Sequence, residues 1–186
     1  MGFGRGNARD GTGDFERFIG GLRELGLDVV FVIDATGSMG WLVDQVKDRV
    51  RLLADWIRQL VPVTRFGVVA YRDLDSPEFV TRVLPLTLSA RRVERFLEVL
   101  GTEGGGDIPE AVDAGLEAAI GEAGFRADAK RVIIVLGDAP PHAERLPAAL
   151  SLASAFHAAG GTVTTVDTSF DANPRVAAAG LVILPW

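Results

Sequence analysis

One short polar loop, DATGS, follows an apolar segment directly and carries three oxygen-bearing side chains. Asp34, Thr36 and Ser38 occupy alternate positions, so in a tight turn their oxygens can face one concavity. Gly37 lets the backbone bend sharply there. One carboxylate and two hydroxyls supply part of the shell of a six-coordinate hard cation such as Mg²⁺. Structural alternatives remain open, because Ser38 could cap a helix, Thr36 could stabilise the turn and Asp34 could accept hydrogen bonds from nearby amides.

Two further acidic residues lie in loops that could join the first. Asp138, in the sequence GDAPPH, follows another apolar segment, and Asp107 lies in the glycine-rich sequence GGGDIPE. Asp107 could ligate a cation directly. It could equally be the N-cap of a helix, with Glu110 three residues later completing a capping box and Pro109 tolerated in the first turn. One carboxylate could also do both.

The elements that position these loops alternate between strand and helix. Short apolar segments rich in β-branched residues predict buried strands, and apolar residues at spacings of three and four predict amphipathic helices. Pro77 and Pro85 bracket a segment with the looser alternation of an edge strand. The predicted strands are 27–33, 65–71, 79–84, 131–136, 162–166 and 181–184, and the predicted helices are 41–60, 89–100, 108–120, 143–159 and 174–179.

Alternating strands and helices predict parallel strands joined by right-handed crossovers, with helices on both faces of the sheet. The expected fold class is therefore α/β, a three-layer doubly wound sheet that is mostly parallel. Segment 79–84 can pair with 65–71 as a hairpin, which adds one antiparallel edge strand. Ligands of such sheets bind beyond the carboxyl ends of the strands, and Asp34 and Asp138 both follow strand ends.

Composition narrows the chemistry. The chain has 186 residues, which predicts one domain with a conventional core. It has no cysteine and two histidines, so any metal must be held mainly by oxygen, which favours Mg²⁺, Mn²⁺ or Ca²⁺ over Zn²⁺. A net charge of -6 and scattered arginines argue against nucleic acid as a partner. No apolar run of eighteen or more residues predicts a membrane span.

The sequence DATGSMG after a buried strand resembles the DxSxS or DxTxS signature of the metal-ion-dependent adhesion site in von Willebrand factor A domains. In that family a threonine from a second loop and an aspartate from a third complete the site. Asp138 matches the third loop, whereas Asp107 stands where the family usually has threonine. The GGGDIPE sequence is similar to a bacterial subgroup with a GGGDxPE motif, including domains attached to atypical kinases. The order of elements from Leu27 to Leu184 also agrees with the family.

This resemblance implies a non-catalytic module that binds a protein through a divalent cation, with Asp34, Thr36, Ser38, Asp107 and Asp138 as the metal site. In adhesive members of the family, a carboxylate from the partner completes the metal shell. If Asp107 ligates directly, the three aspartates offset or exceed a charge of +2. The cation would then be held more tightly but would attract an acidic partner less, and a neutral oxygen could take its place.

Two other functions compete with this interpretation. A strand-end aspartate also opens the DxDx[TV] loop of one class of phosphatases, but Thr36 stands where that chemistry needs its second acid. Alternatively, the domain binds no metal and its acids serve as caps and turn formers. Near the same rim, Tyr71, Arg72 and Asp73 are expected to anchor a loop by local hydrogen bonds, and His142 is expected to be an ordinary loop residue.

The ends of the domain follow from composition and from the resemblance. Residues 1–13 are rich in glycine and predict a flexible lead-in to a single domain over 14–186. They lack the order of a secretory signal, which favours the cytoplasm unless a targeting segment lies outside this chain. The family commonly has a helix after the last strand. Here the segment 14–25 could take its place, or the domain is excised from a longer protein.

Overall fold

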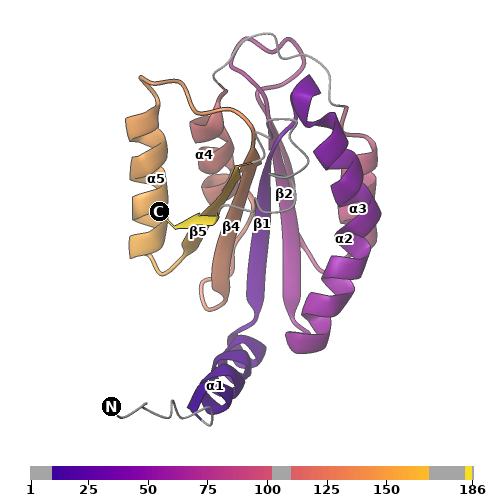
Figure 1. Ribbon diagram of the computed structural model, residues 1–186, viewed down its shortest axis with the longest axis vertical. Coiled ribbons are helices and arrows are strands. Elements are labelled where there is room, and N and C mark those ends of the chain that lie inside the picture. Colours follow the sequence, from indigo (N-terminus) through magenta and orange to yellow (C-terminus); the bar gives the residue numbers. More distant parts are fainter. Residues whose placement is uncertain (1–9, 102–109, 168–182, 186) are drawn as a thin grey trace, which may run out of the picture.

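A computed structural model of the chain, which describes residues 10–101, 110–167 and 183–185, contains one sheet between two layers of helices (Figure 1). The strand order is β3-β2-β1-β4-β5-β6. The strands are β1 (Leu27–Asp34), β2 (Thr64–Tyr71), β3 (Thr81–Thr87), β4 (Lys130–Gly137), β5 (Thr162–Asp167) and β6 (Ile183–Pro185). The strands β2, β1, β4 and β5 are neighbours in this order and are parallel, which confirms the predicted fold class.

Helices cover both faces of the sheet. The covering helices are α2 (Gly40–Leu60), α3 (Ala90–Glu98), α4 (Val112–Glu122) and α5 (Leu146–Ala158), with a short 3-10 turn, η1 (Gly37–Met39), before α2. A further helix, α1 (Asp10–Leu25), precedes β1. One apolar cluster joins the sheet to α2 and α3, and the other joins it to α4 and α5. No helix of the described residues is long and apolar enough to cross a membrane.

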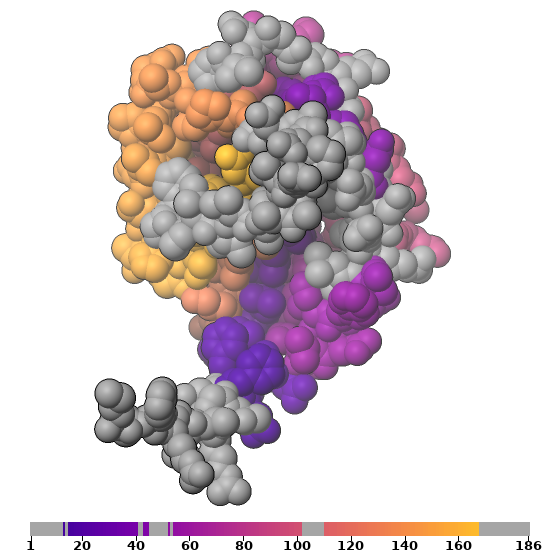
Figure 2. All heavy atoms as spheres, in the orientation of Figure 1, coloured from indigo at the N-terminus to yellow at the C-terminus, as the bar shows by residue number. Residues whose placement is uncertain are grey.

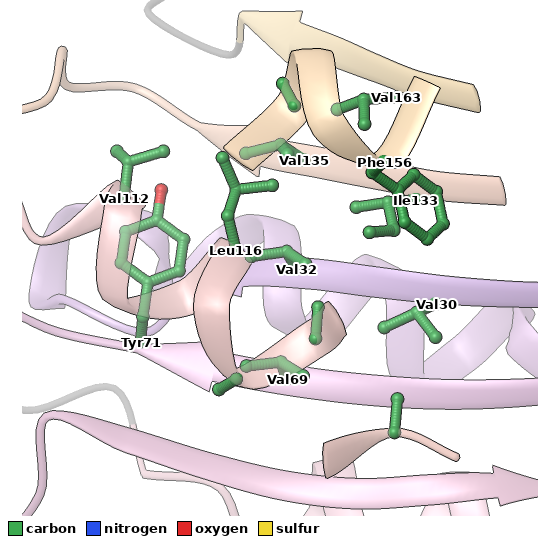
Figure 3. Close-up of a cluster of buried hydrophobic side chains, with 14 of the residues drawn as sticks. Val30, Val32, Val69, Tyr71, Val112, Leu116, Ile133, Val135, Phe156 and Val163 are labelled. Atoms are coloured by element: carbon green, nitrogen blue, oxygen red, sulfur yellow. The ribbon is translucent and has the colours of Figure 1, made fainter. Parts of the chain in front are cut away.

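The alternation of side chains along β1 explains why this strand lies at the centre. Val30 and Val32 point into the cluster beneath α4 and α5, whereas Val29 and Ile33 point into the cluster beneath α2 and α3. Figure 3 shows Val30 and Val32 facing the helical layer beside Ile133 and Val135 of β4. A strand buried on both faces needs apolar residues at nearly every position, and the sequence provides them.

Both sheet edges are antiparallel. The predicted hairpin is confirmed, because β3 pairs antiparallel with β2, but β3 begins at Thr81 and continues through Pro85. Proline is tolerated there because an edge strand has amides that need no ladder partner. At the other edge β6 pairs antiparallel with β5, which adds a second antiparallel strand to the one predicted.

Two helices begin later than predicted. Helix α4 begins at Val112 instead of residue 108, and α5 begins at Leu146 instead of residue 143. A turn precedes α5, because the amides of Arg145 and Leu146 both donate to the carbonyl of His142. Pro147 then lies in the first helical turn, where its missing amide costs nothing. The predicted helix 174–179 lies outside the described residues.

Helix α1 lies beyond the amino ends of the strands and projects from the body of the domain (Figures 1 and 2). It begins at Asp10, inside the segment predicted as a lead-in. Segment 14–25 therefore covers neither face of the sheet, so it does not take the place of the helix that the family commonly has after the last strand. At the junction, the Arg23 guanidinium donates to the carbonyl of Leu60 at 2.7 Å.

Candidate metal centre

The carboxylate of Asp34 is buried at the carboxyl end of β1 and has one oxygen without a partner. Its Oδ1 accepts from the Thr36 amide at 2.8 Å and from the Thr36 hydroxyl at 2.6 Å. Its Oδ2 is buried and has no hydrogen-bond partner among the residues that the structure describes. Burial raises the pKa of Asp34 and the nearby charge of Asp138 adds to this, although the Thr36 hydrogen bonds oppose both effects. An ionised carboxylate with an open buried oxygen is costly unless a cation approaches it.

The hydroxyls of the DATGS loop lie beside Asp34, as predicted. Thr36 is buried, Ser38 is exposed, and their hydroxyl oxygens are 3.3 Å apart. The N-cap of α2 is Met39 and no side chain caps this helix, so the proposed capping role of Ser38 is wrong. The turn role of Thr36 is confirmed, since both its amide and its hydroxyl hold Asp34 in place.

Asp138 follows β4, the strand next to β1. Ile33 and Leu136 are register partners, so the residues that follow them leave the same edge of the sheet side by side. Asp138 is partly exposed, and its charge helps to raise the pKa of both Asp34 and Glu110. The two acidic loops therefore meet at the carboxyl edge, as the strand pattern predicted.

Glu110 is a third acid at this edge, and one of the alternatives from the sequence was that it completes a capping box with Asp107. Its amide donates to the carbonyl of Pro140 at 3.1 Å, and Glu110 forms an isolated parallel bridge with Pro141. Since α4 begins at Val112 with Ala111 as its N-cap, Glu110 precedes the helix and the predicted capping box is wrong. Asp107, the other half of that box, lies outside the described residues.

The Glu110 carboxylate has the same unusual environment as that of Asp34. The residue is 3% exposed, and its Oε2 is buried with no hydrogen-bond partner. Burial, together with the charges of Asp34, Asp73 and Asp138, raises the pKa of Glu110 to about 8, against a smaller opposing effect of His142. Ile108 precedes a proline, which disfavours helical backbone at that residue. That signal could have shown that the helix begins later and leaves Glu110 free to face the site.

Tyr71 completes the buried polar group beneath these acids. It ends β2, it is the register partner of Asp34, and its hydroxyl is buried without a hydrogen-bond partner. A Cβ atom placed on Gly137 would lie 2.7 Å from this hydroxyl, so only glycine fits between Tyr71 and the Asp138 loop. Burial, followed by the charges of Asp34, Glu110 and Asp138, raises the Tyr71 pKa well above its ordinary value. The phenol therefore stays neutral.

Two side chains from the loop after β2 hold the rim together. Arg72 is buried and donates to the carbonyls of Ala35 at 3.2 Å and Gly101 at 2.6 Å, which confirms its predicted anchoring role. Asp73 pairs with Nε2 of His142 at 2.7 Å. This contact links the loop after β2 to the loop after β4, so His142 does more than an ordinary loop residue. The hydrogen bond to Asp73 raises the pKa of His142.

The donor set at this edge suits a hard divalent cation. Asp34, Glu110 and Asp138 offer carboxylate oxygens, and Thr36 and Ser38 offer hydroxyls, all of which are ligands that Mg²⁺ and Ca²⁺ prefer. Two of the carboxylate oxygens are buried and unpartnered. Among the described residues, no three acidic or histidine side chains converge closely enough to hold an ion by themselves. A cation here would need the hydroxyls, water, further loop residues or a partner as well.

Residues 28–169, which include both acidic loops and all the parallel strands, match the family described as von Willebrand factor A domain. The chain belongs to the von Willebrand factor A domain family. This is a family of protein-interaction modules. The match begins at β1 and so leaves α1 outside the shared fold.

One curated relative matches part of this chain. The chain is 29% identical over 119 residues to a protein of Dictyostelium discoideum named alpha-protein kinase vwkA, and the match covers 62% of this chain and 19% of that protein. The chain thus spans about a fifth of the length of this curated relative.

Solved structures show the same fold at low identity. The pilus adhesin SpaC from Lactobacillus rhamnosus GG, in its open conformation, aligns with a TM-score of 0.57 and 17% identity over 75% of this chain and 23% of SpaC. The SpRpn10 VWA domain aligns with a TM-score of 0.57 and 15% identity over 76% of this chain and 74% of that domain. At these identities the similarity shows the fold alone.

Proposed function

We propose that this domain binds another protein through a divalent cation and is not itself a catalyst. The observation that carries this proposal is a pair of buried carboxylate oxygens, Oδ2 of Asp34 and Oε2 of Glu110, that have no hydrogen-bond partner among the described residues. Leaving a buried acceptor unpaired costs about 1–3 kcal/mol, and more when the group is charged. A cation that coordinates one of these oxygens would remove this cost there.

The proposed ligands come from three loops at the carboxyl edge of the sheet. Asp34 supplies the central carboxylate, and Thr36 and Ser38 supply uncharged oxygens from the same turn. Asp138 and Glu110 supply acids from the loop after β4 and the segment before α4. Asp107 remains a proposed ligand from residues outside those described. We propose Mg²⁺ as the cation, with Mn²⁺ and Ca²⁺ as alternatives that use the same oxygen chemistry.

The charge of this centre determines which partner group it would accept. Asp34, Glu110 and Asp138, once ionised around a cation, together outweigh a charge of +2, even without Asp107. An acidic group from a partner would then approach a centre that is no longer positive. We therefore propose that the partner completes the shell with an uncharged oxygen, such as a hydroxyl or carbonyl, and that the acids favour tight cation binding over attraction of a carboxylate.

Thermal unfolding with and without cations tests the proposal. A cation that binds only the folded state, at about a hundred times its dissociation constant, should stabilise the protein by roughly 2.7 kcal/mol. We expect this with Mg²⁺ and expect EDTA to abolish it. The matched control is Glu117→Gln, which removes an exposed acid of α4 and should leave the Mg²⁺ effect unchanged. If millimolar Mg²⁺, Mn²⁺ and Ca²⁺ all leave the parent unaffected, the cation proposal is wrong.

A further inference from the structure

A cavity of about 270 Å³ lies between the sheet and the helices α4 and α5, next to the candidate metal centre. Its walls are mainly apolar and include Tyr71, Leu116, Val135, Ala149 and Val163. Figure 3 shows Leu116 of α4 facing Val135 of β4, with Val163 of β5 beyond and the ring of Tyr71 at one side. The cavity is partly open to solvent, so a side chain from outside the domain can enter it.

The cavity and the metal centre share one loop. Gly137, Asp138 and Pro141 line the cavity, and the same loop presents Asp138 to the centre and forms the bridge between Pro141 and Glu110. A Cβ atom on Gly137 would lie 2.7 Å from the Tyr71 hydroxyl and 3.9 Å from Oδ2 of Asp34. The backbone of this loop therefore lies close both to Tyr71, which lines the cavity, and to Asp34 of the candidate metal centre.

Size and charge define what the cavity can hold. An apolar cavity of about 150 Å³ is enough to bind benzene, whereas pockets for drug-sized ligands begin at about 300 Å³. A volume of about 270 Å³ thus fits one aromatic side chain better than a larger molecule. The nearby carboxylates of Asp34, Glu110 and Asp138 exclude an acidic group, and the apolar walls exclude a charged group of either sign unless it is paired.

We propose that this cavity is the specificity pocket for the partner: it receives an uncharged aromatic side chain of the protein whose oxygen completes the cation shell. This inference rests on the proposed function, because it places both contacts in one interface. Aromatic side chains that fill a desolvated pocket at the centre of an interface contribute a large share of binding energy. The cation then fixes the position of the partner, and the pocket selects the residue beside it.

The probe for this pocket is N-acetyl-phenylalaninamide, an uncharged aromatic residue with blocked ends, added to the whole chain with Mg²⁺ present. The methyl signals of Leu116, Val135 and Val163 are followed by NMR. We expect saturable shifts at these methyls in the millimolar range. The α-amide of N-acetyl-aspartic acid, whose blocked ends match but whose side chain is a carboxylate, should bind at least tenfold more weakly. The absence of shifts at these methyls in the folded protein would overturn the proposal, as would equal binding of the two probes.

Two variants fill the cavity from opposite walls. Ala149→Leu fills it from α5, and Val163→Ile fills it from β5. Because Val163→Ile adds only one methylene group, it still tests the pocket if Ala149→Leu does not fold. Each variant should lower the affinity for the aromatic probe, Ala149→Leu by at least tenfold, without changing the affinity for Mg²⁺. Unchanged probe binding in both folded variants would place the probe elsewhere and reject the pocket. A normal probe response in a parent that shows no Mg²⁺ effect would instead reject the cation and retain the pocket.

Discussion

Strand β1 carries two fully buried aspartates, one at each end, and they differ in how their charge is balanced. Asp28 accepts from Arg65 at 2.6 and 2.9 Å, and from the guanidinium of Arg126 at 2.7 and 3.1 Å. The amide of Arg126 donates to it as well, at 2.9 Å. Burial works against ionisation of Asp28, but these hydrogen bonds prevail and lower its pKa. Asp34 has hydrogen bonds to one oxygen only, and its pKa is raised.

This difference separates an acid whose charge is balanced by arginines from one that has other acids nearby. Asp28 has its counter-charges inside the fold, where they join β1, β2 and the segment before β4. Asp34 has other acids as neighbours, in place of arginines. A buried charge is stable only when it is paired, and Oδ2 of Asp34 has no hydrogen-bond partner among the residues that the structure describes. The arginines at the amino edge of the sheet thus balance the charge of Asp28, whereas two buried carboxylate oxygens at the carboxyl edge have no hydrogen-bond partner among the described residues.

The largest effect on stability should come from disrupting the amino end of β1, where arginines balance the charge of Asp28. Asp28→Asn removes the counter-charge of two arginines that are partly buried, and breaking such a network costs about 3–5 kcal/mol. We expect this loss of unfolding free energy, measured with urea at pH 7, to be the same in EDTA and in Mg²⁺. A loss below about 1 kcal/mol would mean that the amino-end cluster contributes no more than an ordinary surface ion pair.

The stability contributed by the carboxyl edge of the sheet, where Glu110 lies among other acids, should depend on pH when no cation is present. The pKa of Glu110 in the folded protein is about 8, above the ordinary value of 4.5. The folded state therefore holds this proton more tightly, and stability falls as pH rises from 4.5 through 8. Linkage at 1.36 kcal/mol for each tenfold change in proton affinity gives a loss on the order of 4 kcal/mol. Urea unfolding in EDTA between pH 5 and 9 measures this loss.

Mg²⁺ should offset the loss, because the cation holds Glu110 in its ionised form. We expect the Mg²⁺ effect on stability to grow between pH 5 and 8. Glu110→Gln should flatten the pH dependence in EDTA, whereas Glu117→Gln on the exposed side of α4 should keep it. An unchanged pH profile in Glu110→Gln would show that the titrating group lies elsewhere in the carboxyl edge.

The fold could be predicted from the sequence because its signals are periodic and local. Strand β1 is apolar at almost every position, which requires burial on both faces, and α3 begins where Ser89 accepts from the Arg92 amide, as its N-cap predicts. The position of Asp34 and Asp138 at one edge followed from the parallel order alone. Those inferences need no knowledge of which side chains finally touch.

The parts that failed depend on contacts between distant segments. Glu110 has a sequence context that fits a capping box, yet its amide pairs with Pro140 and its carboxylate turns to the acids of other loops. The arginines around Asp28 come from positions 37 and 98 residues further along the chain. Similarly, nothing local to Tyr71 indicates that its hydroxyl would remain unpaired beneath Gly137. Such pairings arise only in the tertiary fold, because they join segments that are far apart in the sequence and leave no local pattern in either segment.

An isosteric change at the open aspartate should separate stability from cation binding. Asp34→Asn keeps the acceptor that holds Thr36 but removes the buried charge, so we expect unfolding free energy in EDTA to be unchanged or higher. The Mg²⁺ effect, roughly 2.7 kcal/mol at a hundred times the dissociation constant in the parent, should disappear. Isothermal titration with Mg²⁺ checks the binding directly. A large loss of stability in EDTA would instead make Asp34 a structural acid like Asp28.

The smallest effect is expected at the two ends of β2, where two buried hydroxyls repeat the contrast. The Thr64 hydroxyl donates to the carbonyl of Val61 at 2.6 Å, whereas the Tyr71 hydroxyl has no partner. Removing a satisfied hydroxyl with Thr64→Val should cost about 1 kcal/mol, because the hydrogen bond is lost. Tyr71→Phe should change the unfolding free energy in EDTA by no more than about 0.5 kcal/mol, or raise it, because only an unsatisfied group is removed. Urea unfolding of both variants measures the difference in unfolding free energy. A greater loss in Tyr71→Phe than in Thr64→Val would show that the Tyr71 hydroxyl stabilises the fold at least as much as the hydrogen-bonded Thr64 hydroxyl does.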